Sequence, residues 1–221
     1  MRIVAFGDIH EHLHTIGKIE GVCDASLVII TGDLTTRGGI EEARGVIELV
    51  RQYNPNIYAL AGNMDRREVE SFLADEGISL HGRGYVVEEK IGIFGVGGSN
   101  PTPFHTPNEL AEDEIAAFIL QGYREVKDAA FKILISHAPP ANTKVDRVAG
   151  GRHAGSKAVR EFIETYQPDL CLTGHIHEAR GEDLIGETPV INPGMLKNGG
   201  YVEINIENNA LKAALKLAAE I

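Results

Sequence analysis

The sequence predicts an α/β protein in which parallel strands alternate with helices, and three observations support this fold class. Short apolar runs at Ile3–Phe6, Leu27–Ile30 and Ile57–Leu60 are rich in Ile and Val, which is typical of strands buried on both faces. Between the last two runs, apolar residues recur at helical spacing over Ile40–Tyr53, and this segment ends two residues before a proline. A β-α-β order implies parallel strands joined by right-handed crossovers.

The rest of the chain predicts more helices, and β-rich segments that form a second sheet packed on the first. A capping box runs from Thr106 to Glu109 with proline at the first helical position, so a helix is expected to begin there. Near the C-terminus, alternating apolar residues on both sides of Asn208-Asn209 predict a β-hairpin. The other expected elements are helices that open near His12 and near Arg66, a helix over Ser156–Tyr166, and strands at Tyr85–Val87, Ile91–Val96, Lys132–Ile135 and Asp169–Thr173.

Composition excludes several classes of protein. The chain has 221 residues, of which 43% are hydrophobic and 24% charged, as in a globular protein, and we expect a single domain over residues 1–221. No apolar run approaches the roughly 20 residues of a membrane helix, and Asp8 comes too early for a signal peptide, so a cytoplasmic location is expected. The net charge of −11 and the lack of a Lys/Arg run argue against large nucleic acids as partners. Cys23 and Cys171 are too few for a disulfide scaffold.

Five of the predicted strands are followed by a small residue and then by one that can bind a metal: Gly7-Asp8, Gly32-Asp33, Gly62-Asn63, Ser136-His137 and Gly174-His175. The carboxyl ends of parallel strands share one edge of a sheet, so these five side chains are expected to meet there. His10 and His177 join them, because each lies two residues after one of the five and an extended segment places both on the same face. Seven ligands are too many for one tetrahedral zinc but suit two ions that share a carboxylate.

These motifs resemble the five ordered blocks of the calcineurin-like metallophosphoesterase superfamily. The blocks are Asp8-Ile9-His10, Gly32-Asp33, Gly62-Asn63-Met64-Asp65, His137 and Gly174-His175-Ile176-His177. The resemblance implies a four-layer α/β/β/α sandwich of two mixed sheets flanked by helices. It also implies an assignment of the ligands to two ions: Asp8, His10 and His177 to the first, Asn63, His137 and His175 to the second, and Asp33 to both. Oxygen and imidazole donors without thiolate favour divalent Mn, Fe, Zn, Ni or Co, with Mn preferred.

By this resemblance the protein is expected to be a dinuclear metal-dependent phosphoesterase that hydrolyses a phosphodiester, small or nucleotide-like, with a metal-bridging hydroxide. Two divalent ions outweigh the carboxylates of Asp8 and Asp33, so the site is expected to attract phosphate despite the acidic composition. A phosphomonoesterase, and a catalytically weak binding or scaffold module on the same fold, are the alternatives. The complete ligand set favours an enzyme, because a site that has lost its activity is expected to lack some ligands. Assembly into homo-oligomers stays open.

One position departs from the pattern of the family. Met64 stands where the third block usually has a histidine that contacts the phosphate and protonates the leaving group, and we interpret Met64 as an apolar residue near the site. His153 is the first candidate for the missing acid, because it lies in a long loop just before a predicted helix N-terminus that also favours phosphate, and His105 in the other long loop is the second. Asp65 is expected to support the ligands from behind. The candidate substrate-binding residues are Asn63, His105, Arg147 and Arg152.

Overall fold

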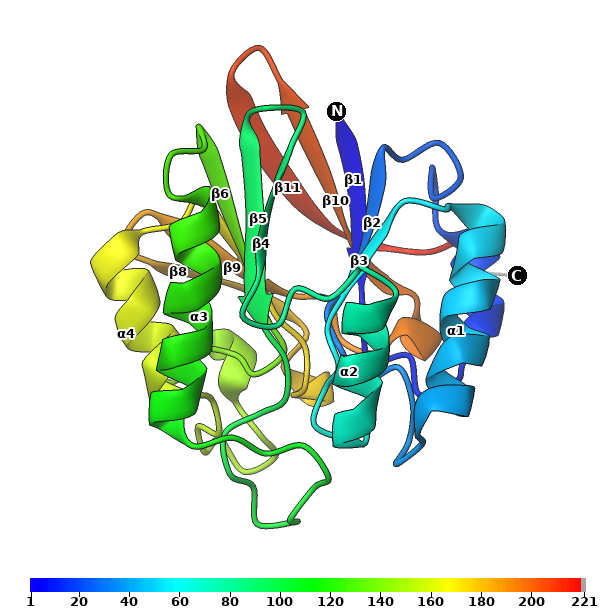
Figure 1. Cartoon of the computed structure of the whole chain (residues 1–221). Coiled ribbons are helices and arrows are strands. Elements are labelled where there is room, and N and C mark those ends of the chain that lie inside the picture. The colour runs from blue at the N-terminus through cyan, green and yellow to red at the C-terminus, as the bar shows by residue number, and fades with distance from the viewer. Residues whose placement is uncertain (220–221) are drawn as a thin grey trace.

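The computed structural model describes residues 1–219, and its strands form two sheets that pack face to face (Figure 1). In the first sheet β1, β2 and β3 are parallel, β10 pairs antiparallel with β1, and β11 pairs antiparallel with β10. The order across this sheet is β11 (Ala210–Leu217), β10 (Gly200–Glu207), β1 (Arg2–Phe6), β2 (Leu27–Ile30) and β3 (Ile57–Ala59).

The second sheet is also mixed. Its four inner strands are parallel, whereas the strands at its two edges run antiparallel to their neighbours. The order across this sheet is β4 (Gly84–Val87), β5 (Ile91–Val96), β6 (Phe131–Ser136), β7 (Leu170–Leu172), β9 (Thr188–Asn192) and β8 (Gly181–Ile185).

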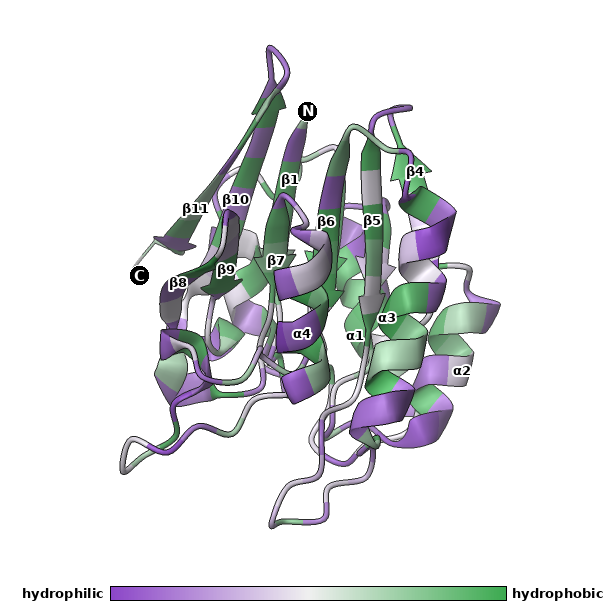
Figure 2. Cartoon of the chain, turned by 90° about the vertical axis from the view of Figure 1, so that its left-hand side faces the viewer, coloured by the Kyte–Doolittle hydropathy of each residue, from purple (hydrophilic) through white to green (hydrophobic). Residues whose placement is uncertain are grey.

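Helices cover the outer face of each sheet. In Figure 1, α1 (Ile40–Tyr53) and α2 (Arg67–Asp75) lie on the first sheet, and α3 (Glu112–Val126) and α4 (Lys157–Tyr166) lie on the second. Figure 2 shows the central strands mostly in green, whereas the outward face of α4 is mostly purple. This arrangement confirms the predicted four-layer α/β/β/α sandwich.

Strand β1 shows why the predicted strands are apolar without interruption. Successive side chains of a strand point to opposite faces of the sheet. Ile3 and Ala5 belong to the core between the two sheets, whereas Val4 and Phe6 belong to the core under α1 and α2. All four are fully buried, so a polar residue at any of them would lie without a partner in one core or the other.

The helix predicted to begin at Thr106, with Pro107 as its first helical residue, has Glu112 as its first residue instead, so that prediction was wrong by five residues. The expected hydrogen bonds do form, because the amide and hydroxyl of Thr106 donate to Glu109 Oε1 at 2.7 and 2.8 Å. They close a turn in the long loop that precedes the helix. A second pair of residues with the same spacing starts the helix itself, where the Ala111 amide donates to Glu114 at 2.8 Å.

One further expectation differs from the structure, one hairpin was not expected, and one expected hairpin is confirmed. The helix expected near His12 is a short 3₁₀ helix, η1 (Leu13–Lys18). The β8–β9 hairpin was not expected because β8 is short and two of its five residues are charged. The C-terminal hairpin is confirmed. Asn208 and Asn209 have φ of 50° and 58°, as a two-residue turn between twisted strands requires.

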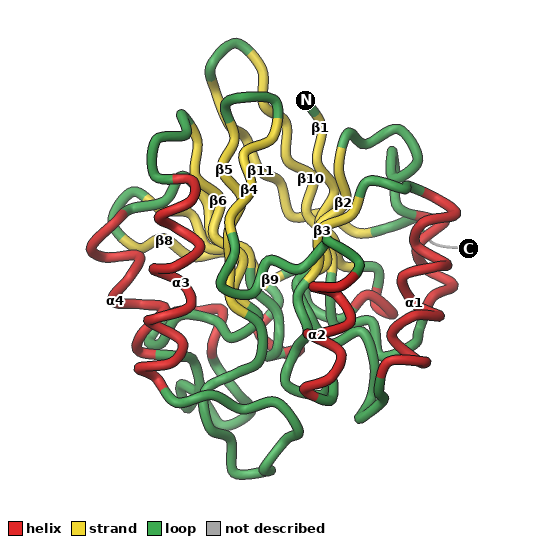
Figure 3. Tube along the Cα trace, in the orientation of Figure 1, coloured by secondary structure: helices red, strands yellow, loops and turns green. Residues whose placement is uncertain are grey.

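Loops gather at one end of the sandwich, beyond the carboxyl ends of the parallel strands (Figure 3). Two long ones cover the second sheet at this end, residues 97–111 between β5 and α3 and residues 137–156 between β6 and α4. In a sheet of parallel strands this is the end at which ligands bind. Among residues 1–219, each helix is too short or too polar to cross a bilayer.

Candidate metal centre

The structure brings the seven predicted ligands together, and it draws them from both sheets. Asp8, Asp33 and Asn63 follow β1, β2 and β3 of the first sheet, whereas His137 and His175 follow β6 and β7 of the second. The sequence pattern alone had placed all five at one edge of one sheet. Because the strand ends of the two sheets face each other across the sandwich, the ligands instead line the seam between the sheets.

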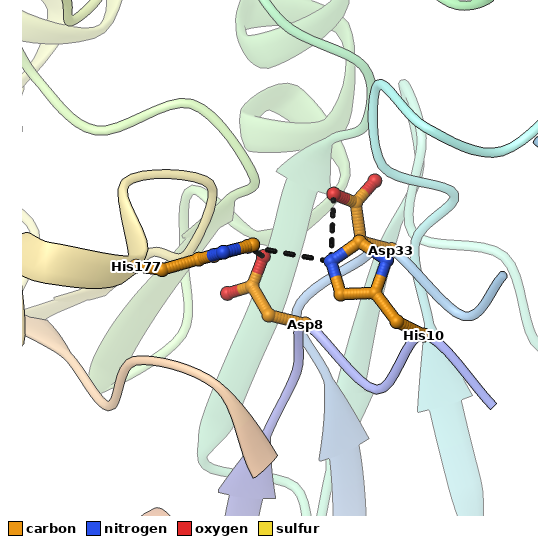
Figure 4. A group of neighbouring side chains, drawn as sticks. All are labelled: Asp8, His10, Asp33 and His177. Carbon is orange, nitrogen blue, oxygen red and sulfur yellow. Dashed lines mark hydrogen bonds and ion pairs between the residues drawn. The ribbon is translucent and has the colours of Figure 1, made fainter. Parts of the chain in front are cut away.

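One group of ligands lies around Asp8. Donor atoms of Asp8, His10, Asp33 and His177 all lie within 4.8 Å of one another. His177 Nε2 is 3.2 Å from Asp8 Oδ1 and 3.3 Å from His10 Nε2. Figure 4 shows His10 between His177 and Asp33, with its Nε2 3.6 Å from Asp33 Oδ2.

A second group lies on the other side of Asp33. His137 Nε2 and His175 Nδ1 approach Asn63 Oδ1 to 3.0 and 2.7 Å. Asp33 Oδ1 lies 3.4 Å from His137 Nε2, whereas Oδ2 of the same carboxylate faces His10. Asp33 therefore stands between the two groups and presents one oxygen to each.

Sharp backbone turns direct these side chains toward the candidate metal centre. Asp8, His10, Asp33 and His175 have φ of 47°, 46°, 50° and 68°, a left-handed conformation that residues other than glycine seldom adopt. Backbone hydrogen bonds hold the turns, such as that from the Asp8 amide to the Gly32 carbonyl at 3.0 Å. Strained residues of this kind cluster where function requires a fixed geometry.

The small residues before the ligands are required by close packing. A Cβ at Gly62 would collide with the Asp33 carboxylate, and one at Gly174 would lie 2.6 Å from Asp8 Oδ2. Gly32 has φ of 119° and lies against the His137 ring, so it needs both the conformational freedom and the small size of glycine. The spacing found in the sequence therefore reflects contacts between neighbouring ligands.

Two histidines have their tautomers fixed by backbone carbonyls. His10 Nδ1 lies 3.2 Å from the Thr35 carbonyl, and His137 Nδ1 lies 3.0 Å from the Thr31 carbonyl. A carbonyl only accepts, so each Nδ1 carries the hydrogen, and a neutral ring then presents the lone pair of Nε2 to the centre. Metal-binding histidines are commonly oriented in this way.

Asp65 lies behind the ligands and connects the loops that follow β2 and β3. Its buried carboxylate accepts hydrogen bonds from the amides of Leu34, Thr35 and Gly62 at 2.7 to 3.1 Å, and from the Thr35 hydroxyl at 2.8 Å. Burial and the nearby charge of Asp33 raise the pKa of Asp65 to about 7, against the effect of these donors. The carboxylate fixes the two loops that carry Asp33 and Asn63.

The charges of the centre suit a cation. Burial alone would raise the pKa of Asp33, but the facing His137 and His10 and the Met64 amide lower it to about 2. Burial likewise opposes the charge on His137, yet Asp33 and Asp8 raise its pKa to about 9. Within residues 1–219, neither Asp8 nor Asp33 is paired with a lysine or arginine. Buried carboxylates of this kind need positive charge, and oxygen and imidazole donors fit divalent cations.

A cavity of about 930 Å³ opens over the centre and reaches the two long loops. Metal-centre residues Asp33, Asn63, His175 and His177 form part of its lining, and Met64 lies beside them. His153, Arg152 and Phe104 also line the cavity, as does Arg37, which no sequence motif marked. Among the described lining residues, His105 and Arg147 are absent, and both are exposed outside the cavity.

The N-terminus of α4 is not open to phosphate, contrary to the expectation from sequence. Glu112 accepts hydrogen bonds from the amides of Lys157 and Ala158, at 3.0 and 2.9 Å, and from the Ser156 hydroxyl at 2.6 Å. Its carboxylate already occupies the position that an anion would take. No sequence pattern predicts this contact, because Glu112 and Ser156 are far apart along the chain.

Comparison with known proteins identifies the family. The profile described as calcineurin-like phosphoesterase matches residues 1–179. The chain belongs to this family. Members use divalent metals, and the cluster of Asp8, His10, Asp33 and His177 is able to bind one. The family predicted from the sequence motifs is confirmed.

Relatives of this calcineurin-like phosphoesterase extend over most of the chain. MJ1162, an uncharacterised protein of Methanocaldococcus jannaschii, is 36% identical over 198 residues, which cover 87% of this chain and 88% of the relative. The crystal structure of TT1561 of Thermus thermophilus superposes with a TM-score of 0.72 at 19% identity, over 96% and 97% of the two chains. That of a dimetal phosphatase from Danio rerio gives 0.63 at 9% identity, over 99% of both. The two superpositions show the shared fold.

Proposed function

We propose that the protein hydrolyses a phosphodiester, small or nucleotide-like, with the help of two divalent cations, of which manganese is favoured. The observation that carries this proposal is the position of Asp33 between two groups of buried donors, with one oxygen toward each. Strands from both ends of the chain share the core between the sheets, which supports the further proposal that the chain acts as a single domain.

In this proposal each group of donors holds one cation: Asp8, His10 and His177 the first, Asn63, His137 and His175 the second, and Asp33 both. Cations in these positions would lower the pKa of a water between them and offset the charge that develops on the phosphoryl oxygens. The protein holds the donors in place before substrate arrives. Asp65 fixes the loops, and the Thr31 and Thr35 carbonyls fix the rings of His137 and His10.

The cavity supplies groups that suit a phosphate ester. Asn63 turns its Oδ1 toward the histidines, so its Nδ2 is the amide group left for a phosphoryl oxygen. Arg37 and Arg152 are exposed at the cavity and, within residues 1–219, have no carboxylate partner. Both are therefore able to bind phosphate oxygens as the ester enters. Met64 contributes its amide, which donates to Asp33 Oδ1 at 2.8 Å, but no side-chain proton.

Cavity size and lining favour a diester with an organic group over inorganic phosphate or a very small monoester. A volume of about 930 Å³ far exceeds a phosphate, and the lining continues over Pro101, Pro103 and Phe104. Phe104 is 76% exposed, which leaves its ring free to stack on a flat group such as a base. The proposal of a nucleotide-like substrate rests on this ring.

The test compares an aryl phosphodiester with the matching monoester. Protein stripped of metal and loaded with one divalent ion at a time should cleave the diester with the higher kcat/KM, most actively with Mn²⁺. A higher kcat/KM for the monoester would mean that the protein is a phosphomonoesterase rather than a phosphodiesterase. Failure of every metal on both substrates, with two ions still bound, would favour the binding or scaffold module. Asp128→Asn, an exposed change outside the cavity, serves as the control variant.

A further inference from the structure

The long loop between β6 and α4 is built around one buried carboxylate. Asp146 is fully buried, and its two oxygens accept hydrogen bonds from the amides of Asn142, Thr143 and Gly155 at 3.0, 2.9 and 3.1 Å. These amides come from both ends of the loop. A single side chain therefore closes the segment into a compact unit.

The ring of His153 is bound to this carboxylate. Its Nδ1 lies 2.6 Å from Asp146 Oδ1, a short distance typical of a hydrogen bond to a charged acceptor. Backbone contacts fix the same geometry, because the Ala154 amide donates to the Asp146 carbonyl at 3.0 Å and His153 forms a β-bridge with Arg147. The imidazole is thus held by its neighbours on both sides.

The two side chains differ in their access to the cavity. Asp146 has no exposed side-chain surface, whereas a third of the His153 side chain is exposed, and His153 lines the cavity that contains the metal ligands. A carboxylate only accepts, so the Nδ1 that faces it carries a hydrogen. Nε2 is the ring nitrogen that remains for a bound substrate.

The proposed reaction needs a proton donor that the ligands do not supply. An alkoxide leaving group departs slowly unless it is protonated, and a positioned acid contributes about 10²–10⁴-fold. Met64 has no proton to give. Of the carboxylates in the cavity lining, Glu112 is bound to the start of α4 and Glu178 accepts from the Ala149 amide at 3.0 Å. His175 and His177 belong to the metal centre, which leaves His153 as the remaining imidazole of the lining.

We propose that His153 protonates the leaving group from Nε2 and that Asp146 is the residue that positions it; this inference rests on the proposed hydrolase function. In the step, a water oxygen forms a bond to phosphorus and loses a proton, while the bond from phosphorus to the leaving oxygen breaks. The proton on Nε2 passes to the leaving oxygen, and Nδ1 keeps its hydrogen on Asp146. Solvent restores the proton to Nε2 after the products depart.

Leaving-group dependence tests the role of His153. His153→Ala should lower kcat about 10²–10⁴-fold for an alkyl diester and less than about 10-fold for a nitrophenyl diester, whose leaving group needs no proton. The loss should fall mainly on kcat and leave KM little changed. Equal losses on the two substrates would overturn the assignment of His153 as the acid.

A double-mutant cycle tests the role of Asp146. Asp146→Asn should show the same preference for the activated substrate as His153→Ala, and it should add no further preference in the His153→Ala background. A loss that is equal on both substrates, or that persists without His153, would show a merely structural role. Arg160→Ala is the matched control, because its guanidinium donates to the Ala141 and Asn142 carbonyls at 3.1 and 2.9 Å and so supports the same loop through backbone carbonyls rather than through Asp146. The control should leave the leaving-group preference unchanged.

A spectroscopic measurement separates this inference from the proposed function. Long-range ¹H–¹⁵N spectra of the metal-free protein should show the neutral His153 ring with its hydrogen on Nδ1, whether or not any substrate is cleaved. A ring with its hydrogen on Nε2 would overturn the pairing with Asp146. Absence of turnover in the wild-type protein with the Nδ1 form present would instead count against the hydrolase function and against His153 as its acid.

Discussion

The floor of the cavity and its walls are built in different ways. We define the floor as the seven donors Asp8, His10, Asp33, Asn63, His137, His175 and His177, and the walls as residues 97–111 and 137–156 apart from His137. Most floor residues lie within four residues of the end of a strand, and most are buried. The walls have few buried apolar side chains, and hydrogen bonds to carboxylates hold them together. Glu109 accepts from Thr102 and Thr106, and Asp146 accepts from the amides of Asn142 and Thr143.

This difference separates what the two regions control. The sheets fix the floor, so its geometry is the same for any substrate that enters. The walls depend on a few polar contacts within each loop, and such segments open at lower free energy than packed strands. A change in the floor should therefore affect every substrate, whereas a change in a wall should affect one class of substrate more than another.

Removal of the shared carboxylate gives the largest expected effect. Asparagine in Asp33→Asn keeps one oxygen and presents an NH₂ group to either His10 or His137, so one donor group loses its oxygen and the other its charge. We expect both ions to bind more weakly and kcat/KM to fall by at least about 10³-fold, since the metals supply several kcal/mol of transition-state stabilisation. Metal stoichiometry and steady-state rates on two unlike substrates measure this.

The matched control is an aspartate at the other end of the strands. Asp169 also accepts a backbone amide, that of Lys132 at 2.7 Å, but it lies just before β7. Asp169→Asn should keep both ions and full activity. Two tightly bound ions and normal turnover in Asp33→Asn would contradict the bridging role, and with it the distinction between floor and walls.

The convergence of the floor residues could be predicted from the sequence because strands leave a periodic signal. Each apolar run is followed by a small residue, and some of these residues lie directly against a ligand, as Gly62 does against Asp33 and Gly174 against Asp8. The walls leave no such signal. Glu112 reaches the start of α4 and Asp146 reaches His153 through contacts between polar residues of loops, where no pattern of hydrophobicity applies. The false helix start at Thr106 has the same origin, because its capping contacts are local and also stabilise a turn.

His81 links a wall to the second sheet, and it predicts a pH effect on stability. Its Nδ1 accepts a hydrogen bond from the Gly97 amide at 3.1 Å, and its ring packs on Phe118 with centroids 4.1 Å apart. Burial lowers the pKa of His81 from 6.5 to about 4. Between these values the unfolded chain binds a proton that the folded protein does not, so the contribution of His81 to stability is complete above pH 6.5 and is lost as pH falls to about 4.

Replacement of His81 by a residue that does not titrate isolates this contribution. His81→Gln retains an acceptor for the Gly97 amide, and its free energy of unfolding should fall less steeply between pH 6.5 and 4, by about 3 kcal/mol over the interval. Urea unfolding at a series of pH values measures the difference from wild type. If the free energy of unfolding changed with pH in the same way for both proteins, the pKa of His81 would not be lowered in the folded state.

The smallest expected effect tests the wall most directly. Phe104→Ala removes the exposed ring from the cavity lining without touching the floor, and a lost stacking contact costs about 1–3 kcal/mol per base. We therefore expect KM for a nucleotide diester to rise about 10-fold, while kcat and the metal stoichiometry stay unchanged. KM for a dialkyl phosphate, which has no flat group, should not move. An equal rise in KM for both substrates would mean that Phe104 maintains the conformation of the loop and does not stack on the substrate. The proposal of a nucleotide-like substrate would then have no support.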